Sequence, residues 1–217
     1  MDKIVQKDKH KKAKAKLLII VSVVVGLLLL LIIASIMIDH FEKIGEDTER
    51  VIDYNFYPPD YDENIFEDPE YLSLIESGFM QYHDSTTGVT SGITRENAEK
   101  HNGEVKFIVD MLYKIIYGDH RGYNEFFSKK YYEAHTPKES FTMQKIYDVL
   151  ITYVSSEKIT SDDGSEYTKY VYMLEYKILH NNGTFRKDIG EGSKRQYFTI
   201  NNSSGELLID SITTVNY

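Results

Sequence analysis

The residues of this chain best suited to chemistry are Asp119, His120 and His135. A carboxylate can orient an imidazole as a general base, and a histidine titrates near neutral pH. Asp119 and His120 are adjacent, however, in a segment flanked by Gly118 and Gly122, and adjacent side chains on a strand or helix point in different directions. The sequence therefore favours a loop with a helix-terminal histidine over a catalytic pair.

Other catalytic and metal-binding patterns are missing from the sequence. His101, His120 and His135 lack the i, i+4 spacing of two metal ligands on one helix. No Gly-x-Ser-x-Gly, phosphate-loop or dinucleotide-binding pattern occurs. There is no cysteine, which excludes thiolate zinc sites, cysteine nucleophiles and a disulfide framework. We therefore predict no enzyme activity, no metal and no cofactor.

One acidic cluster resembles a cation site in composition only. An EF-hand loop needs glycine at its sixth position and a bidentate glutamate at its twelfth, and the cluster has neither. We therefore predict a solvated acidic linker here. The cluster consists of Asp60, Asp62, Glu63, Glu67 and Asp68.

An uncharged apolar run fills residues 17–38, with Leu17 first and Ile38 last. Twenty-two helical residues span about 33 Å, enough to cross a hydrocarbon core of roughly 30 Å. A cleaved signal peptide has an apolar region of only about 7 to 15 residues. We therefore predict a transmembrane helix that stays uncleaved, with the lipid bilayer as a partner.

Lysines give this helix a direction. Seven lysines lie in residues 1–16, whereas residues 39–47 are mainly acidic. The excess of positive charge places the N-terminal tail in the cytoplasm. We therefore predict a single-pass protein of the cell membrane with residues 39–217 outside the cell. The lysines nearest the apolar run are Lys11, Lys12, Lys14 and Lys16.

The exported part is strongly acidic. It holds 18 of the 25 Lys and Arg and 32 of the 34 Asp and Glu, a net charge of about −14. Because binding to phosphates needs a basic face, we expect no direct nucleic-acid partner for this part. Abundant Lys, Ile, Tyr and Asn without Trp or Cys favour a Gram-positive bacterium as the source.

The exported part is predicted to divide into a stalk and a domain. Residues 39–92 are acidic and rich in turns, apart from a short helix near 69–81 that Asp68 would cap. Glycine, serine and threonine in residues 85–92 are typical of a flexible connector. Residues 93–217 then form a folded domain.

The domain begins with helical patterns. An apolar stripe at helical spacing predicts a helix from Thr94 to Tyr117, which Gly118 would end. A second, shorter helix is predicted over residues 123–134. The stripe consists of Val105, Ile108, Val109, Leu112, Ile115 and Ile116.

After Pro137 the apolar period changes to two, which predicts strands. A hairpin turn is expected at Asn181-Asn182-Gly183, because a type I′ turn needs positive φ at both central residues. Helices followed by an antiparallel meander predict an α+β domain, with helices packed on a curved antiparallel sheet. The predicted strands cover residues 144–160, 167–180, 186–201 and 206–216.

Tyrosine offers a candidate binding surface. The chain has 18 tyrosines, and tyrosine is enriched at protein interfaces because its ring is apolar and its hydroxyl can stay hydrated. The alternative is that most of these tyrosines occupy ordinary half-buried positions in the sheet and have no binding role. The predicted interface, an exposed face of one strand, consists of Tyr167, Tyr170, Tyr172 and Tyr176.

The order of elements and the stretch Tyr123-x-x-Phe126-Phe127-Ser128-x-x-Tyr131 resemble the nuclear-transport-factor-2-like (cystatin-like cone) superfamily over residues 94–217. With a lysine-rich tail and one membrane span, the layout resembles the single-pass scaffold subunit of type IV secretion and conjugation machines. That resemblance implies an exported domain that self-associates and contacts other channel subunits. It also implies a cone that can hold a small ligand.

Two functions are compatible with this sequence. The first is a structural and interaction subunit of a cell-envelope transfer complex, acting through protein–protein contacts, with a homo-oligomer among its expected assemblies. The second is a surface-displayed domain that binds a small ligand or a peptide. A cone sealed by large side chains would favour the first, and an open pocket with convergent polar groups would favour the second.

Overall fold

The structure, a computed structural model, describes residues 56–76, 78–161, 164–189 and 192–215. All of them belong to one compact unit, Tyr54–Tyr217. Within these ranges no helix is long and apolar enough to cross a membrane. The predicted cytoplasmic tail and transmembrane helix, residues 1–38, lie outside the described residues.

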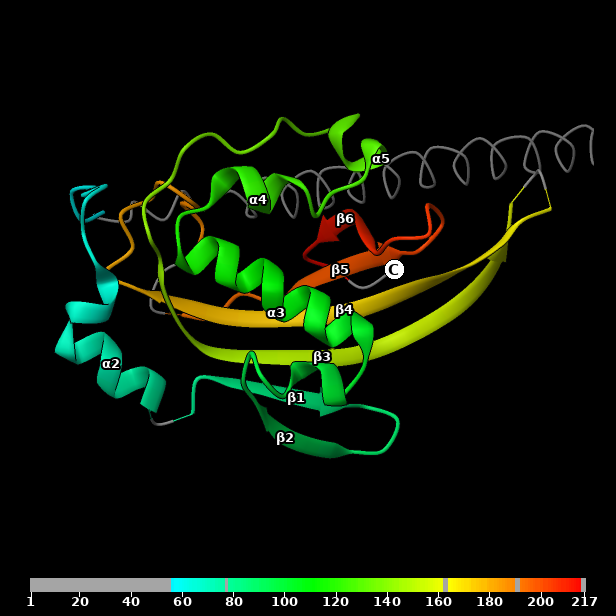
Figure 1. Ribbon diagram of the computed structural model, residues 1–217, viewed down its shortest axis with the longest axis horizontal. Helices are drawn as coiled ribbons and strands as arrows, with labels where there is room; N and C mark the ends of the chain where they lie inside the picture. The colour runs from blue at the N-terminus through cyan, green and yellow to red at the C-terminus, as the bar shows by residue number, and fades with distance from the viewer. Residues whose placement is uncertain (1–55, 77, 162–163, 190–191, 216–217) are drawn as a thin grey trace, which may run out of the picture. The chain divides into compact units, whose positions relative to one another are not determined.

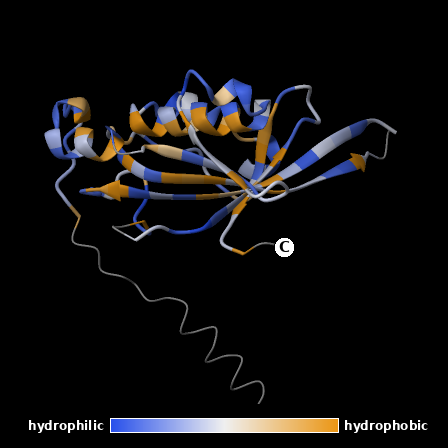
Figure 2. Ribbon diagram, turned by 90° about the horizontal axis from the view of Figure 1, so that it is seen from below, coloured by the Kyte–Doolittle hydropathy of each residue, from blue (hydrophilic) through white to orange (hydrophobic). Residues whose placement is uncertain are grey.

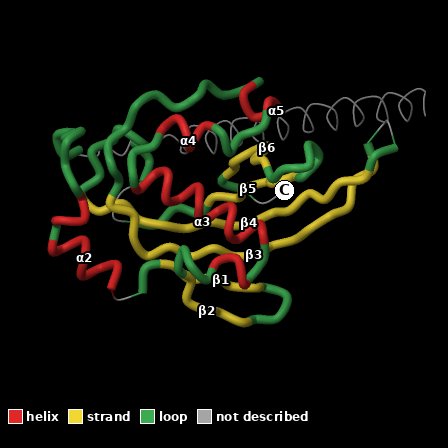
Figure 3. Tube along the Cα trace, viewed as in Figure 1, coloured by secondary structure: helices red, strands yellow, loops and turns green. Residues whose placement is uncertain are grey.

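The described residues form an α+β domain (Figure 3). Two short 3-10 helices, η1 (Ile65–Glu67) and η2 (Ala98–Lys100), accompany four α-helices and six strands. The helices are α2 (Pro69–Glu76), α3 (Gly103–Ile116), α4 (His120–Asn124) and α5 (Lys129–Tyr132). The strands are β1 (Met80–Asp84), β2 (Val89–Ile93), β3 (Lys145–Thr160), β4 (Glu166–Leu179), β5 (Gln196–Asn201) and β6 (Leu208–Thr213).

The six strands make one curved sheet in the order β2-β1-β3-β4-β5-β6. Strands β1 and β3 run parallel and every other pair is antiparallel. The predicted purely antiparallel sheet is therefore wrong, whereas helices packed on a curved sheet are confirmed. Figures 1 and 2 show the helices gathered on one side of the sheet.

The sheet begins inside the predicted stalk. Residues 80–93 form the hairpin of β1 and β2 instead of a flexible connector. Its turn is fixed by the Asp84 carboxylate, which accepts the Thr86 N–H at 2.8 Å, and by Gly88, whose φ is +72°. The stalk prediction therefore does not hold for this segment, because alternating Met80 and Tyr82 supply buried side chains to the core.

Helix α2 begins as predicted and ends earlier. Asp68 caps it, since its Oδ1 accepts the N–H groups of Glu70 at 2.9 Å and Tyr71 at 3.4 Å. Tyr71 is fully buried, and its hydroxyl donates to the carbonyl of Ile146 at 2.9 Å. This hydrogen bond ties α2 to the start of β3.

Helix α3 supplies the centre of the core. All six residues of the predicted stripe are buried, which confirms the stripe. The helix starts later than predicted, at the cap Asn102, whose side chain accepts the Val105 N–H at 2.7 Å. Gly118 ends it with φ +66°, and a Cβ there would lie 3.0 Å from the backbone of Phe141 and Met143. Glycine thus lets residues 141–143 pass close to the helix end before β3 begins at Lys145.

The predicted helix over residues 123–134 is two short helices. Between α4 and α5 the chain turns at residues 125–126, and Phe127 then forms an isolated parallel bridge with Ile209 of β6. Ser128 then caps α5 by accepting the Tyr131 N–H at 3.3 Å. Tertiary pairing with β6 therefore interrupts the helical pattern.

The predicted hairpin at residues 181–183 is wrong. Gly183 does adopt positive φ, at +73°, but β4 and β5 are joined by a long connection from His180 to Arg195. The predicted strand over 186–201 is correspondingly reduced to Gln196–Asn201. Side chains of this connection turn inward, as Phe185 and Ile189 are buried.

The predicted tyrosine interface is contradicted at its central positions. Tyr172 and Tyr176 are 1% and 2% exposed, and Tyr170 packs against the same core. Alternation along β4 places these three on the helix side of the sheet and Tyr167 on the opposite side. These three tyrosines belong to the core or pack against it, so they contribute to folding.

We predict that Tyr172→Ala lowers the free energy of unfolding by about 3–5 kcal/mol, because it leaves a cavity in the core. Tyr172→Phe should cost only about 1 kcal/mol, since it removes the hydrogen bond from Asn102 Nδ2, 3.2 Å from the hydroxyl. Urea unfolding followed by circular dichroism measures both.

Tyr167→Ala is the matched control, and its expected cost is below about 1 kcal/mol because Tyr167 is only half-buried. Equal losses for Tyr167→Ala and Tyr172→Ala would contradict the placement of Tyr172 in the core.

Candidate functional site

The carboxylate of Asp119 is engaged in local structure. Its Oδ1 accepts the Gly122 N–H at 2.9 Å and caps α4, while Oδ2 pairs with Lys114 Nζ at 2.7 Å. The hydrogen bond from Lys114 lowers the pKa of Asp119. The ring of His120 instead packs edge-on to Phe141 at 6.5 Å. Asp119 thus stabilises the start of α4 and the end of α3.

His135 lies on a different surface. Its ring stacks on Tyr131 with centroids 4.2 Å apart, and its Nδ1 lies 3.0 Å from the Tyr131 carbonyl oxygen. The predicted candidates are therefore not brought together by the fold. In the described ranges no group of three His, Cys, Asp or Glu is placed to hold a metal ion.

Aromatic rings fill the space between α4 and the sheet. Tyr123 meets Phe185 edge-on at 5.4 Å, and Phe141 meets Phe185 at 5.0 Å. Tyr123, Phe141 and Phe185 are all nearly inaccessible to solvent. Edge-to-face packing of such rings is favourable beyond the burial of their area. The interior on the helix side of the sheet is thus closed here by large side chains.

A paired cation lies at the edge of this aromatic cluster. Arg186 donates from Nε and Nη2 to the two carboxylate oxygens of Asp188 at 2.8 and 2.6 Å. Its Nη1 donates to Gln196 Oε1, and Lys194 Nζ lies 2.6 Å from Asp188 Oδ2. Burial alone would raise the pKa of Asp188, but these hydrogen bonds hold it well below its usual range.

A recess opens beside this ion pair. It has a volume of about 480 Å3 and is lined by Tyr131, His135, Lys138 and Arg186, among others. Lys138 donates to the Phe185 carbonyl at 2.8 Å. Because the lining cations outnumber the single carboxylate of Asp188, the recess can accept an anionic group.

Sequence reasoning missed Arg186 and Asp188. The sequence predicts a strand for their segment, and in a strand their i, i+2 spacing places both on one face. Their opposite charges on the same face of a predicted strand are the only sign in the sequence that they form an ion pair. The partners Lys194 and Gln196 become neighbours only through the loop that precedes β5.

The other side of the sheet carries no helix among the described residues (Figure 2). On β4, Met173 is flanked by Thr152 of β3 and Tyr197 of β5. Further along β4, two charged residues form ion pairs with neighbouring segments. Glu175 pairs with Arg195 at 3.2 Å, and Lys177 pairs with Asp148 at 2.6 Å. We call the following half-buried apolar residues the uncovered sheet face: Leu150, Val171, Met173 and Tyr197.

Comparisons with protein-family models, curated proteins and solved structures give no match.

We predict that Asp188→Asn destabilises the domain by about 1–2 kcal/mol at pH 7. Each hydrogen bond to a charged group contributes about 1.5–3 kcal/mol, and solvent screens part of this because the Asp188 side chain is 42% exposed. Thermal unfolding at pH 7 measures the change.

The same pair predicts a pH dependence. Because the folded-state pKa of Asp188 is lowered, its contribution is complete above the unfolded pKa of about 3.9 and is lost as pH falls below it. Stability should therefore fall less steeply below about pH 4 in Asp188→Asn than in the wild type. Exposed Glu166→Gln is the control, and identical curves for wild type and Asp188→Asn would contradict the pair.

Proposed function

We propose that this chain is a membrane-anchored structural subunit of a cell-envelope transfer complex of the conjugation or type IV secretion kind. Its exported domain, in this proposal, has a nuclear-transport-factor-2-like cone and catalyses no reaction. It binds neighbouring subunits through the uncovered sheet face. The expected anchor at residues 17–38 holds that face close to the outer surface of the membrane.

The observation that carries the proposal is the contrast between the two sides of the sheet. Large side chains fill the helix side, including Tyr123, Tyr172 and Tyr176. The opposite side has an apolar centre around Met173 with charged and hydroxyl side chains around it. An apolar core within a polar rim is the usual anatomy of a protein–protein interface.

A second copy of the chain is the partner to which we commit. Two copies anchored in one membrane have a high effective concentration, so a modest interface is enough to hold them together. The uncovered sheet face also has both signs of charge at its edge, Glu175 beside Arg195. A two-fold axis can therefore bring opposite charges together in an isologous contact.

We predict that Met173→Lys weakens self-association at least tenfold, because a lysine at the centre of the contact would lose its hydration without gaining a partner. Sedimentation equilibrium of the full-length chain in detergent micelles measures the change. A wild-type chain that stays monomeric at its highest attainable concentration would refute the second copy as partner.

Val89→Lys is the matched control. Val89 lies on β2, away from the uncovered sheet face, and is already 58% exposed. The same change there should leave association within twofold of the wild type. Equal loss in both variants would indicate a general effect of charge instead of a specific contact.

The second candidate function is a surface-displayed binding domain, and the recess beside Arg186 favours it. Its lining by Tyr131, His135 and Lys138 suits a short acidic peptide, through aromatic contact and charge. Saturable binding of such a peptide that Lys138→Glu abolishes would support this candidate. If no such binding is observed, the second candidate is refuted and only the subunit function remains.

A further inference from the structure

A second cavity lies beneath the first described segment of the domain. Residues 56–64, here called the strap, cross the start of β3 and the end of β4. The strap is held by the Tyr57 N–H, which donates to the Asn181 carbonyl at 3.2 Å, and by Glu63, 2.5 Å from Lys145 Nζ. The cavity beneath has a volume of about 260 Å3.

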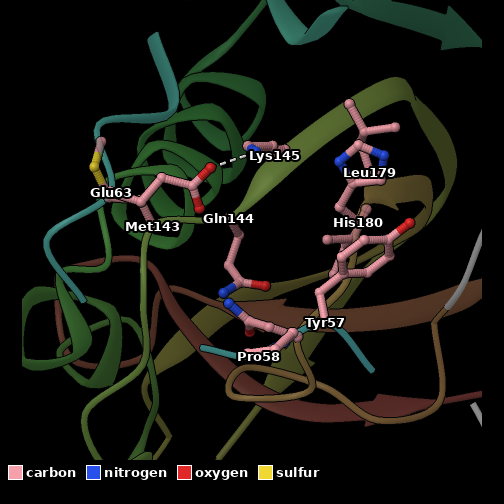
Figure 4. A pocket seen from close by; sticks show the side chains of 10 residues that line it. Tyr57, Pro58, Glu63, Met143, Gln144, Lys145, Leu179 and His180 are labelled. Carbon is pink, nitrogen blue, oxygen red and sulfur yellow. Dashed lines mark hydrogen bonds and ion pairs between the residues drawn. The ribbon is translucent and has the colours of Figure 1, made fainter. Parts of the chain in front are cut away.

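Gln144 projects into this cavity, between Glu63 and Met143 on one side and Tyr57 and His180 on the other (Figure 4). It is only 1% exposed. Its Nε2 donates to the Thr142 carbonyl at 3.0 Å. Because a carbonyl oxygen can only accept, this bond fixes which end of the amide faces Thr142.

The other end of the amide is an acceptor without a donor. Among the described residues, Gln144 Oε1 is buried and has no hydrogen-bond partner. Buried polar atoms are nearly always paired with protein, water or a ligand. The cavity is therefore built to receive an N–H or O–H donor at this point.

Charge in and around the cavity wall favours a cation as that donor. Lys145 is the buried cation, and two carboxylates bind its Nζ, Glu63 at 2.5 Å and Asp68 at 2.9 Å. The hydrogen bond from Lys145 lowers the pKa of Asp68, so Asp68 stays ionised at neutral pH. Glu70 adds a further carboxylate, 3.6 Å from His180 Nε2. Of these three carboxylates only Glu63 lines the cavity, but together they outnumber the one lysine beside them.

An aromatic wall faces the same space. The Tyr57 ring is 53% exposed and lies 4.6 Å from the His180 ring. His180 has φ +50°, a left-handed conformation that is uncommon outside glycine and concentrates at functional sites. Met143 and Leu179 supply apolar lining nearby. A cation with an alkyl chain matches both kinds of wall.

We propose that this cavity binds a primary alkylammonium group. Its N–H groups donate to Gln144 Oε1 and to the Glu63 carboxylate, and its charge faces the Tyr57 ring. The alkyl chain lies against Met143 and Leu179. A free aliphatic amine and a lysine side chain present the same chemistry to this site, which is separate from the uncovered sheet face.

Saturation-transfer NMR of the full-length chain in micelles tests the proposal with three probes of equal chain length. We expect n-pentylammonium to bind saturably and at least tenfold more tightly than n-pentyltrimethylammonium, which keeps the charge without N–H donors, or n-pentanol. Equal binding of the three probes, or no saturable binding of n-pentylammonium, would overturn the proposal. Adding Nα-acetyl-lysine N-methylamide distinguishes the sources, because tighter binding than n-pentylammonium assigns a lysine side chain and weaker binding assigns a free amine.

Two substitutions locate the site. Gln144→Met should weaken n-pentylammonium binding at least tenfold, and Glu63→Gln at least fivefold. Glu67→Gln makes the same charge change four residues further on, outside the cavity lining, and should stay within twofold of the wild type. Glu63 is 38% exposed, so Glu63→Gln remains informative if Gln144→Met fails to fold.

The sheet-face variant Met173→Lys should bind n-pentylammonium as the wild type does. Loss of amine binding in Met173→Lys, or unchanged binding in both Gln144→Met and Glu63→Gln, would refute this location.

Discussion

Packing of the α3 stripe against the concave side of the sheet is the interaction on which the rest of the domain depends. Leu112 of α3 lies in one buried cluster with Ile151 of β3 and Leu174 of β4. Each of the three is almost fully buried, and burial of apolar area is the main stabilising term in folding. A helix on this side requires the sheet to curve around it. Register shifts in β3, next to Asp148 and Tyr153, provide that bending.

This packing determines what is available for function. The helices occupy the concave side, so the tyrosines that point there stabilise the core, and the opposite side keeps half-buried apolar residues such as Met173. The two candidate ligand sites lie among the connections at the ends of the strands. There the connections fold back, and two cations are paired: the buried Lys145 with two carboxylates, and the half-buried Arg186 with Asp188. Both cavities with functional potential lie beside these paired cations, because loops that bury a charge also bring polar groups together.

Sequence reasoning succeeded where a period persists over many residues. The stripe of α3 and the long strands β3 and β4 have such periods, and their identity as helix or strand was predictable. Strands β1 and β2 have only five residues each, and β2 contains threonine, serine and glycine, so their pattern in the sequence is too weak to predict them. They are stabilised by pairing, β1 with β3 and β2 with β1. The residues of β4 alternate between two partly apolar faces, so the sequence alone did not indicate that Tyr172 faces a helix. The cavity under the strap was beyond sequence reasoning, because Glu63 and Gln144 meet only in the folded chain.

Photo-cross-linking in intact membranes tests most directly whether the uncovered sheet face is a contact surface. The chain has no cysteine, so Tyr197→Cys carries a single photoreactive label on that face, and exposed Lys100→Cys carries one on η2. We predict that the label at position 197 forms covalent dimers of the chain and the label at position 100 forms few. Dimers from position 100 in equal or greater amount, or none from position 197, would contradict a role in assembly for this face.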